Sequence, residues 1–232
     1  MAKSDRATAP AVVRAVRILS YLAEHSAAQR LTAIAGAIGI PVSSTAAICN
    51  ALEAERMIVR RNEGYVLGPL NVELAQRFLS QLQPLSAFAD VVADHQALRR
   101  ETVQMALLDG FDMLYVARRD SDQPFLISSA VGVRLPANCT AVGKASLALL
   151  TPRERKVPKK MIALTEHSIT DSKALGRALD EVVRAGYAVD DEETSLGVVC
   201  FGVARKTARA EIYGISATML KSRVTPEPVS YT

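Results

Sequence analysis

Hydrophobic residues recur at three- to four-residue intervals along the first quarter of the chain, and this spacing predicts short helices. Residues 11–25 have the pattern of an amphipathic helix. A second helix is expected over residues 33–38, capped by Thr32 and ended by Gly39. A third is expected to begin at residues 43–45 and to run to about residue 55, with Ile48 and Leu52 facing inward. The pattern therefore predicts a small helical head with a sharp corner between its second and third helices.

An alternating pattern replaces the helical spacing after residue 56. The segments "MIVRR" and "YVLG" predict two short strands joined by the turn "NEG". Three helices followed by a hairpin are typical of a winged helix-turn-helix, in which the third helix enters the major groove of DNA. Arg60 and Arg61 lie on the hairpin, where a wing meets phosphates. A small helical domain that binds protein fits the same pattern, but the basic hairpin disfavours it.

An apolar stripe follows the hairpin along the segment "PLNVELAQRFLSQLQ". It consists of Leu70, Leu74, Phe78 and Leu82, and further apolar residues widen it. One narrow contact does not need so much apolar surface. We therefore expect a linker helix over residues 69–83 that packs both on its own domain and on a partner chain.

The remainder of the chain mixes strand and helix patterns. Strands are expected near residues 102–110, 113–119, 124–132, 187–205 and 211–220, and helices near 85–100, 140–150 and 172–186. This order predicts an α+β domain in which helices pack on an antiparallel sheet. The chain of 232 residues is thus divided into a winged helix-turn-helix domain at 1–68, the linker helix at 69–83 and a larger domain at 84–232.

The composition narrows the class of protein. With 49% hydrophobic and 22% charged residues, the chain is expected to be globular. It contains no apolar run of about 18 residues and no apolar leader, so we expect a cytoplasmic protein with no membrane partner. Three widely spaced cysteines favour reduced thiols over a disulfide framework. The three histidines pair with no cysteine at zinc spacing, so no metal and no cofactor is expected.

Basic residues concentrate at the N-terminal end. Residues 1–62 contain eight lysines and arginines but four acidic residues, and this excess equals the whole formal net charge of +4. A basic first quarter on a charge-balanced remainder suggests a nucleic-acid-binding head on a different kind of body. A solvated basic surface would have the same charge.

Three ordered segments resemble the IclR family of bacterial transcriptional regulators. They are the winged-helix segment, "LPANCTAVGKASLALL" and "RAGYAVDDEETSLGVVCFGVA", the last of which follows the family pattern "RGYAxDxEExxxGxxCxAxP". The resemblance covers almost the whole chain. It implies that residues 84–232 form a GAF-like effector-binding domain that binds a small molecule. It also implies a homodimer built through the DNA-binding domains, often paired into a tetramer through the effector domains.

The predicted third helix has no lysine or arginine between Pro41 and Glu55, whereas members of the family often have a basic residue at the position of Ala47. Base contacts to a double-stranded DNA operator are therefore expected from Ser43, Ser44, Thr45 and Asn50. Phosphate contacts are expected from Arg14, Arg17, Arg30, Arg60 and Arg61.

The resemblance also assigns effector-contacting residues. The aspartate that contacts the effector in the family matches Asp190, and the pocket carried over with it comprises Ile127, Leu135, Ala141, Val142, Cys200, Ser216 and Thr218. The chemistry of these residues agrees in outline with a ligand pocket. Ala141 begins a predicted helix, whose free N–H groups favour an anion. Ser216 and Thr218 alternate with apolar residues, so their hydroxyl groups share one face of a strand, although such pairs also occur in ordinary cores.

The expected effector is a small organic acid whose anion meets the helix start and whose hydroxyl group donates to Asp190. The run of carboxylates at residues 190–193 also fits an ordinary charged turn. Two other functions stay open: a sensor that acts through protein contacts without DNA, and an enzyme that uses Cys200 as a nucleophile. A nucleophile needs a base and an oxyanion site, and His167 is the only histidine beyond residue 95, so we expect a regulator and not an enzyme.

Overall fold

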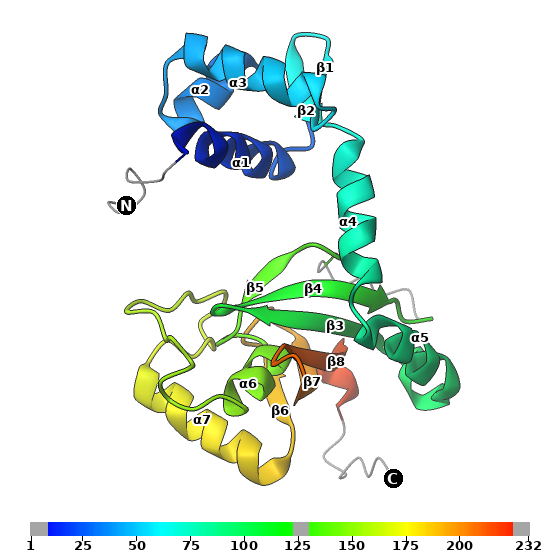
Figure 1. Cartoon of the computed structure of the whole chain (residues 1–232). Helices are drawn as coiled ribbons and strands as arrows, with labels where there is room; N and C mark the ends of the chain where they lie inside the picture. Colours follow the sequence, from blue (N-terminus) through cyan, green and yellow to red (C-terminus); the bar gives the residue numbers. More distant parts are fainter. Residues whose placement is uncertain (1–8, 123–129, 225–232) are drawn as a thin grey trace. The chain divides into compact units, whose positions relative to one another are not determined.

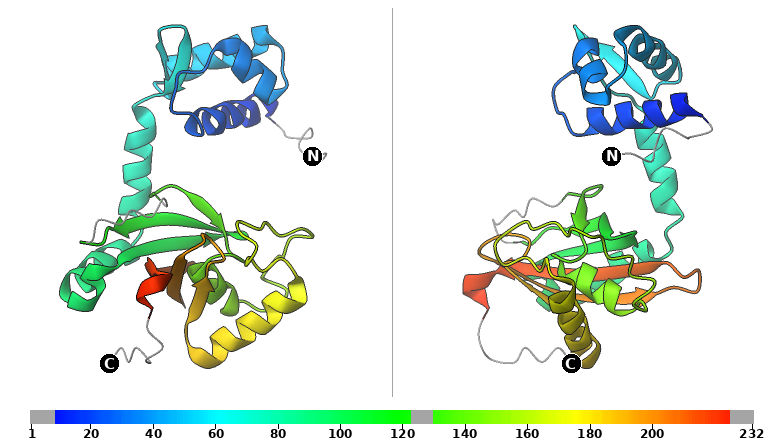
Figure 2. Two further views of the ribbon diagram at one scale, coloured as in Figure 1. Left: turned by 180° about the vertical axis from the view of Figure 1, so that it is seen from behind. Right: turned by 90° about the vertical axis from the view of Figure 1, so that its left-hand side faces the viewer.

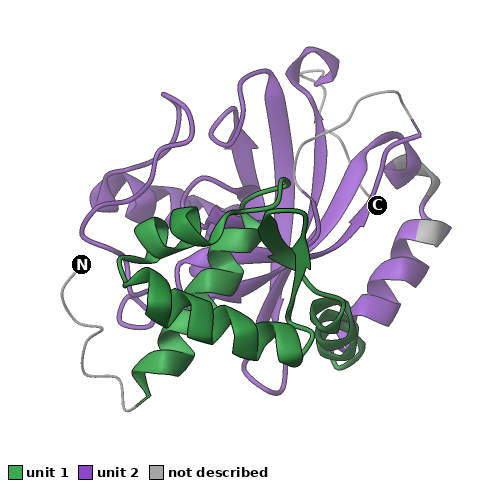
Figure 3. Ribbon diagram, turned by 90° about the horizontal axis from the view of Figure 1, so that it is seen from above, with its two compact units in different colours: residues 1–81 green, residues 82–232 purple. Residues whose placement is uncertain are grey.

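The computed structural model describes residues 9–122 and 130–224. The chain divides into two compact units, Met1–Gln81 and Leu82–Thr232 (Figure 3). No single helix in the described ranges is long and apolar enough to cross a membrane.

Three helices surround the core of the first unit (Figure 1). They are α1 (Pro10–Ala23), α2 (Leu31–Ile38) and α3 (Val42–Ala54). The chain bends by 109° between α2 and α3. Gly39 makes this bend possible, because its φ of 73° lies in the left-handed region that a residue without Cβ adopts readily. Thr32 was predicted to cap α2, and this is wrong: the helix begins two residues earlier, after Arg30, and has no side-chain cap.

The core of the first unit uses helix faces that differ from the predicted ones. Its buried members are Ile18, Leu22, Ile34, Cys49, Ile58 and Tyr65. On α3, Thr45 and Cys49 are fully buried, whereas Ile48 and Leu52 pack only at the edge of this cluster. The inward face of α3 is therefore rotated from the predicted Ile48–Leu52 pair.

A two-stranded hairpin completes the first unit as a winged helix-turn-helix. Strands β1 (Ile58–Arg61) and β2 (Gly64–Leu67) pair antiparallel, and Arg61 lies opposite Gly64. The segment before α2 adds to this hairpin through Gln29 and Tyr65, whose backbone N–H groups donate to each other's carbonyls at 2.9 and 2.8 Å. This extra pairing ties the wing to the helices.

Helix α4 (Leu70–Ser80) follows the wing and buries none of its residues. Val72, Leu74 and Phe78 are 64%, 53% and 42% exposed. Leu82 lies beyond the helix end, belongs to the second unit and is buried, so the apolar stripe is shorter than predicted. Within the described part of the chain, no residue buries the apolar stripe on α4.

The second unit is built on a six-stranded sheet in the order β5-β4-β3-β8-β7-β6, in which every neighbouring pair is antiparallel (Figures 1 and 2). The strands are β3 (Thr102–Asp109), β4 (Asp112–Arg119), β5 (Arg134–Pro136), β6 (Ala188–Asp191), β7 (Val198–Lys206) and β8 (Ile212–Leu220). A loop at residues 192–197 interrupts the strand predicted over 187–205. Most of the strand predicted at 124–132 lies outside the described residues.

Helices pack on this sheet. They are α5 (Pro84–Asp94), α6 (Ala141–Ala148) and α7 (Ser172–Ala185), with 3₁₀ turns at Gln96–Arg100 and Lys221–Arg223. Helix α6 contacts β7, β8 and α7, and α5 contacts β3 and β4. The helix predicted over residues 85–100 is therefore divided into α5 and a 3₁₀ turn. The second unit has the predicted α+β fold with an antiparallel sheet, as a GAF-like domain does.

The first turn of α6 rests directly on β7. A Cβ atom at Gly202 would lie 2.7 Å from both the carbonyl carbon of Ala141 and the amide nitrogen of Val142, so only glycine fits here. Gly202 pairs with Ser216 on β8. The N-terminus of α6 consequently lies beside Ser216, and this contact forms one wall of the cavity described below.

Candidate functional site

The exposed face of α3 carries small polar side chains. Ser43 and Asn50 are exposed, and Ser44 is half-buried. Thr45 is fully buried, and its hydroxyl group donates to the carbonyl of Pro41 at 3.1 Å. Thr45 was predicted to contact bases, but its side chain is enclosed in the core because α3 turns this position inward. The outward face therefore presents Ser43, Ser44 and Asn50.

The two arginines of the wing differ in their surroundings. The guanidinium of Arg60 donates to the hydroxyl of Tyr65, lies 5.0 Å from the centre of the Tyr65 ring and is 4.0 Å from a carboxylate oxygen of Glu53. Arg61 is exposed and forms no ion pair with a residue in the described ranges. The wing thus holds one arginine in place and leaves the next one extended into solvent.

The remaining predicted arginines also lie on the surface of the first unit. Arg30 forms an ion pair with Glu63 of the wing turn at 2.6 Å, with both side chains more than 70% exposed. Arg14 and Arg17 are exposed on α1. An exposed ion pair of this kind contributes little to stability, so Arg30 can exchange its partner for a phosphate.

The second unit contains a cavity of about 580 Å³ between the sheet, the start of α6 and two loops. Six of the predicted effector residues line it: Leu135, Ala141, Asp190, Cys200, Ser216 and Thr218. Val142 does not. Its side chain belongs to the hydrophobic core and meets Gly214, because the helix turns this position away from the cavity. Ile127 lies outside the described residues.

Polar side chains form the floor of the cavity. Ser216 and Thr218 both face it, as their alternation on the strand predicted. Ser216 pairs with Gln104 of β3, and Thr218 lies opposite Cys200 of β7, to whose sulfur its hydroxyl donates at 3.3 Å. Burial and the neighbouring Asp190 raise the pKa of the Cys200 thiol far above its ordinary value, so this sulfur stays protonated.

Asp190 is committed to the loop that follows its own strand. Its Oδ1 accepts the backbone N–H groups of Glu193 at 2.8 Å and Thr194 at 3.1 Å, and its Oδ2 lies 2.5 Å from the hydroxyl of Thr194. Burial raises the pKa of Asp190, and the hydrogen bonds from Thr194 do not cancel that rise. Asp190 therefore fastens the cavity rim, and most of its acceptor capacity is used within the protein.

The N-terminus of α6 also faces the cavity. Thr140 caps it by accepting the N–H of Gly143 at 3.0 Å, and Thr140 and Ala141 both line the wall. The described residues that line this space include no lysine, arginine or histidine. The helix end is consequently the source of positive potential at this wall.

A buried ion pair lies behind the cavity. Lys144 of α6 contacts a carboxylate oxygen of Glu193, and both side chains are almost fully buried. Burial raises the pKa of Glu193 to about 7 although the charge of Lys144 opposes this. Because Glu193 lies in the loop that Asp190 holds, the pair ties this loop to α6.

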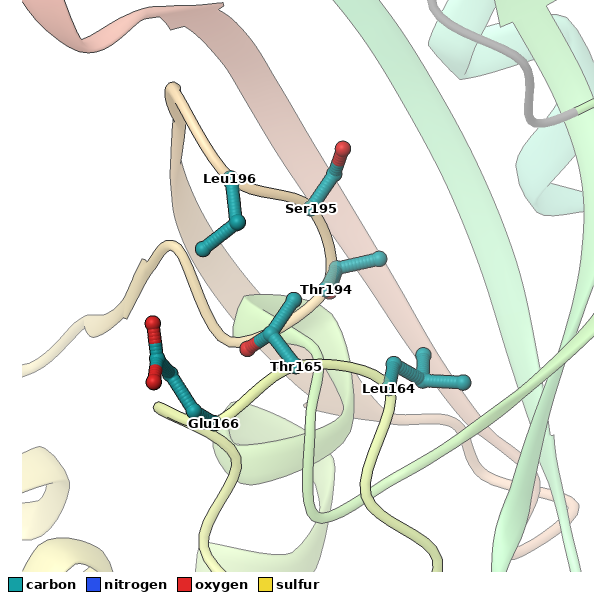
Figure 4. A pocket seen from close by; sticks show the side chains of 6 residues that line it. All are labelled: Leu164, Thr165, Glu166, Thr194, Ser195 and Leu196. Atoms are coloured by element: carbon teal, nitrogen blue, oxygen red, sulfur yellow. The ribbon is translucent and has the colours of Figure 1, made fainter.

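Two loops form the mouth of the cavity, and Figure 4 shows six of their side chains. They line an open hollow of about 480 Å³ and are Leu164, Thr165, Glu166, Thr194, Ser195 and Leu196. Leu164, Thr194, Ser195 and Leu196 also line the inner cavity. The hydroxyl groups of Thr165 and Ser168 donate to the carbonyls of Glu192 and Glu193, both at 2.6 Å, and so join the two loops.

Sequence reasoning missed several residues of the cavity, above all Gln104, Tyr115 and Thr194. Gln104 was detectable, because it is the single amide in the apolar strand "TVQMALL". Tyr115 had no such signal, since an aromatic residue in a strand usually indicates a core position. A β-bulge between Met105 and Ala106 sets the register that places Tyr115 opposite Ala106.

Comparisons with known proteins agree over most of the chain. The family described as "Bacterial transcriptional regulator IclR C-terminal" matches residues 76–232, and the "IclR helix-turn-helix domain" matches residues 11–62. The regulator TtgV of Pseudomonas putida is 30% identical over 221 residues, which cover 93% of this chain and 83% of TtgV.

Solved structures are similar as well. The IclR protein of Thermotoga maritima superposes with a TM-score of 0.70 at 25% identity and covers 93% of this chain and 90% of its own. An IclR homologue from Microbacterium hydrocarbonoxydans, solved in complex with 4-hydroxybenzoate, shares the fold with a TM-score of 0.76 at 23% identity, over 93% of this chain and 91% of that one.

Proposed function

The chain belongs to the IclR family of bacterial transcriptional regulators, and from that membership we propose that it binds an operator as a homodimer and senses a small organic acid. It is a transcriptional regulator with a helix-turn-helix domain and an IclR effector domain. The finer points, namely the DNA-contacting residues, the assembly and the effector, are argued below from the two units separately.

The outward face of α3 supports the DNA contacts. Ser43, Ser44 and Asn50 are proposed to meet base edges, because their side chains face outward and an asparagine can bond an adenine with two hydrogen bonds. The arginines at positions 14, 17, 30, 60 and 61 are proposed to contact phosphates. Access to the chromosome is required for this role, so we also propose a cytoplasmic location.

The exposed apolar face of α4 is the observation that carries the proposed dimer. Leu74 and Phe78 are about half exposed, and large apolar side chains lying together on a helix usually mark an interaction site. A second copy would cover this stripe and present two copies of α3 to a pseudo-palindromic operator. Pairing of two dimers into a tetramer is possible for such a chain, but no feature described above requires it.

The cavity of the second unit supports the effector. Its volume of about 580 Å³ suits a small molecule, the start of α6 favours an anion, and the hydroxyl-rich floor suits further polar groups. We therefore propose a small organic acid bearing a hydroxyl group, such as a short keto or hydroxy acid or a hydroxylated aromatic acid. The 4-hydroxybenzoate bound by the Microbacterium homologue belongs to this class.

Neither alternative function gains support. For catalysis by Cys200, the thiol would have to ionise, but burial raises its pKa, and no histidine lies among the described residues that line the cavity. A sensor without DNA contacts would not need the arginines on the wing. TtgV is itself named a transcriptional regulator.

A gel-shift assay tests the proposal. The purified protein should retard DNA from upstream of its own gene but not a shuffled sequence of equal length. Addition of 4-hydroxybenzoate or lactate should then change the retarded fraction. Equal retardation of both DNAs would contradict a specific operator, and retardation of neither would contradict DNA binding.

A further inference from the structure

Two side chains that line the cavity carry hydroxyl groups with no hydrogen-bond partner in the described part of the chain. Tyr115 and Ser216 are only 5% and 4% exposed, and both line the cavity. Neither side chain makes a hydrogen bond to any residue in the ranges 9–122 and 130–224. Both hydroxyl groups open into the cavity and are not used by the protein, so they are free to donate to a ligand there.

Both groups can donate to an anion without carrying charge themselves. Ser216 lies beside the start of α6, because its neighbour Gly202 is the residue on which that helix rests. The Tyr115 hydroxyl lies near Cys200 and Asp190, and burial raises the pKa of Tyr115 so that it keeps its proton. The cavity therefore offers neutral donors on two sides.

Asp190 would repel an anion if it were ionised, and the hydrogen bonds of Thr194 argue that it is not. The hydroxyl oxygen of Thr194 lies 2.5 Å from Oδ2 of Asp190 and 2.9 Å from the carbonyl oxygen of Cys139. Thr194 has one hydroxyl proton and cannot donate to both. If Oδ2 of Asp190 carries a proton, it donates to Thr194, and Thr194 donates to Cys139. Only this arrangement satisfies both contacts.

We propose that the hydroxyl groups of Tyr115 and Ser216 donate to the oxygens of the acid effector, while Asp190 remains a neutral carboxylic acid that fastens the rim loop. This rests on the proposed function of the cavity and adds a specificity-determining residue, Tyr115, to it. It also removes the ligand contact that the sequence had predicted for Asp190. The effector is then an anion bound in a site whose described lining residues carry no charged side chain.

The groups around Asp190 agree with a neutral state. The titratable groups that face it come from β4, the segment before α6, α6 itself, the rim loop and β7, and they are Tyr115, Cys139, Lys144, Glu193 and Cys200. The one cation among these five groups, Lys144, is paired with Glu193. Burial raises the pKa of Asp190 in spite of Lys144.

Asp190→Asn tests the protonation state without a ligand. The asparagine carbonyl can accept the two amides, and its NH₂ group can donate to Thr194, so this variant reproduces the neutral acid. A carboxyl group whose folded pKa is raised stabilises most at low pH and loses that contribution as pH rises through the folded pKa. The melting temperature of the wild type should therefore fall relative to that of Asp190→Asn as pH rises above 3.8, the ordinary pKa of an aspartate. A constant difference, with the variant less stable throughout, would overturn the neutral state.

Calorimetry with matched acids and amides tests the donors. Lactate and 4-hydroxybenzoate are the probes, and lactamide and 4-hydroxybenzamide are their uncharged counterparts. At least one acid should bind more tightly than its amide. The affinity of the wild type for that acid should fall as pH rises, whereas the affinity of Asp190→Asn should stay constant. Tyr115→Phe and Ser216→Ala should each weaken that acid about tenfold. Tyr187→Phe removes the hydroxyl of an exposed tyrosine outside the cavity lining; it is the control and should change this affinity less than about twofold.

The outcomes separate this inference from the proposed function. Failure of both acids to bind at millimolar concentration, or equal affinity of acid and amide, would overturn the inference. If Tyr115→Phe binds the acid as tightly as the wild type does, Tyr115 does not donate to the effector. DNA retardation by the wild type and by Tyr115→Phe in the absence of acid would survive each of these results, since it depends on the first unit.

Discussion

The two units place their polar side chains in opposite ways. Among the described residues, the first unit buries one polar side chain, Thr45, whereas the second buries ten polar or charged ones. The polar groups with proposed roles in the first unit lie on its surface, around α3 and the wing. Those of the second unit enclose a cavity. A surface that binds a polyanion stays hydrated and sensitive to salt, while an enclosed site depends on burial and protonation.

This contrast sets what each unit tolerates. In the first unit a substitution on the surface should change binding and leave folding intact. In the second unit the cavity wall is also part of the packed interior, so most substitutions there should change both. The predictions below test this distinction, beginning with the change expected to have the largest effect.

The largest effect is expected from charge on the exposed stripe of α4. Leu74→Glu combined with Phe78→Glu should leave the chain folded, because neither side chain is buried, but should prevent a second copy from covering the helix. Sedimentation should show a shift from dimer to monomer. Operator affinity should fall by about a hundredfold or more, because two linked reading helices bind far more tightly than one.

Gln76→Glu combined with Ser80→Glu is the matched control. These residues are exposed, have the same four-residue spacing and add the same charge on another face of α4. This control should remain dimeric. If the Leu74 and Phe78 variant is folded and still dimeric at low micromolar concentration, α4 does not form the interface.

The next effect concerns the packed wall of the cavity. Gly202→Ala would place a Cβ atom 2.7 Å from the backbone of Ala141 and Val142, so α6 would have to move off the sheet. We expect the free energy of unfolding to fall by about 1–3 kcal/mol, as in other overpacked interiors, together with loss of acid binding.

Gly176→Ala provides the comparison, because a Cβ atom on this residue of α7 would meet no atom within 4 Å. It should be neutral or stabilising by up to about 1 kcal/mol, since alanine favours a helix more than glycine does. Denaturant unfolding measures both variants. Equal stabilities would mean that α6 is not held by its contact with Gly202.

The same contrast explains how far the sequence could predict the molecule. Helices and strands followed from periodicity, and Gly39 and Pro41 indicated the corner between α2 and α3. Side-chain direction was harder to predict. In α3 the sequence "SSTAAICNAL" contains small residues on every face, so Thr45 could not be told apart from Ser44 until the core was seen.

The cavity raised a different difficulty. Six effector positions followed from the family resemblance, but the resemblance does not say whether a side chain faces the ligand or the core, and Val142 faces the core. The partners of Asp190 lie three and four residues further along the chain, in a loop whose shape depends on tertiary contacts. Tyr115 depends on a β-bulge, which periodicity does not reveal.

A smaller effect is expected on the reading face of α3. Asn50→Ala should weaken binding to the cognate operator by about 1–3 kcal/mol and have little effect on random DNA, because base contacts carry sequence information. Thr45→Val is the counterpart. It removes a buried hydroxyl that bonds to Pro41, so it should lower stability without changing base preference. Competition gel-shifts with operator variants would show each effect, and an altered base preference in Thr45→Val would return that residue to the reading face.

The smallest effect is expected from a single exposed charge on the wing. Arg61 extends into solvent without an ion pair to any residue in the described ranges, so its removal should cost no folding stability. Arg61→Ala should weaken binding to operator and random DNA alike, and the slope of log affinity against log salt should become shallower by roughly one unit.

Arg209→Ala changes the net charge equally in an exposed turn of the second unit and should leave the slope unchanged. Titrations at several salt concentrations would compare them. The same slope change in both variants would mean that DNA responds to the total charge of the protein, and the wing would then have no phosphate contact of its own.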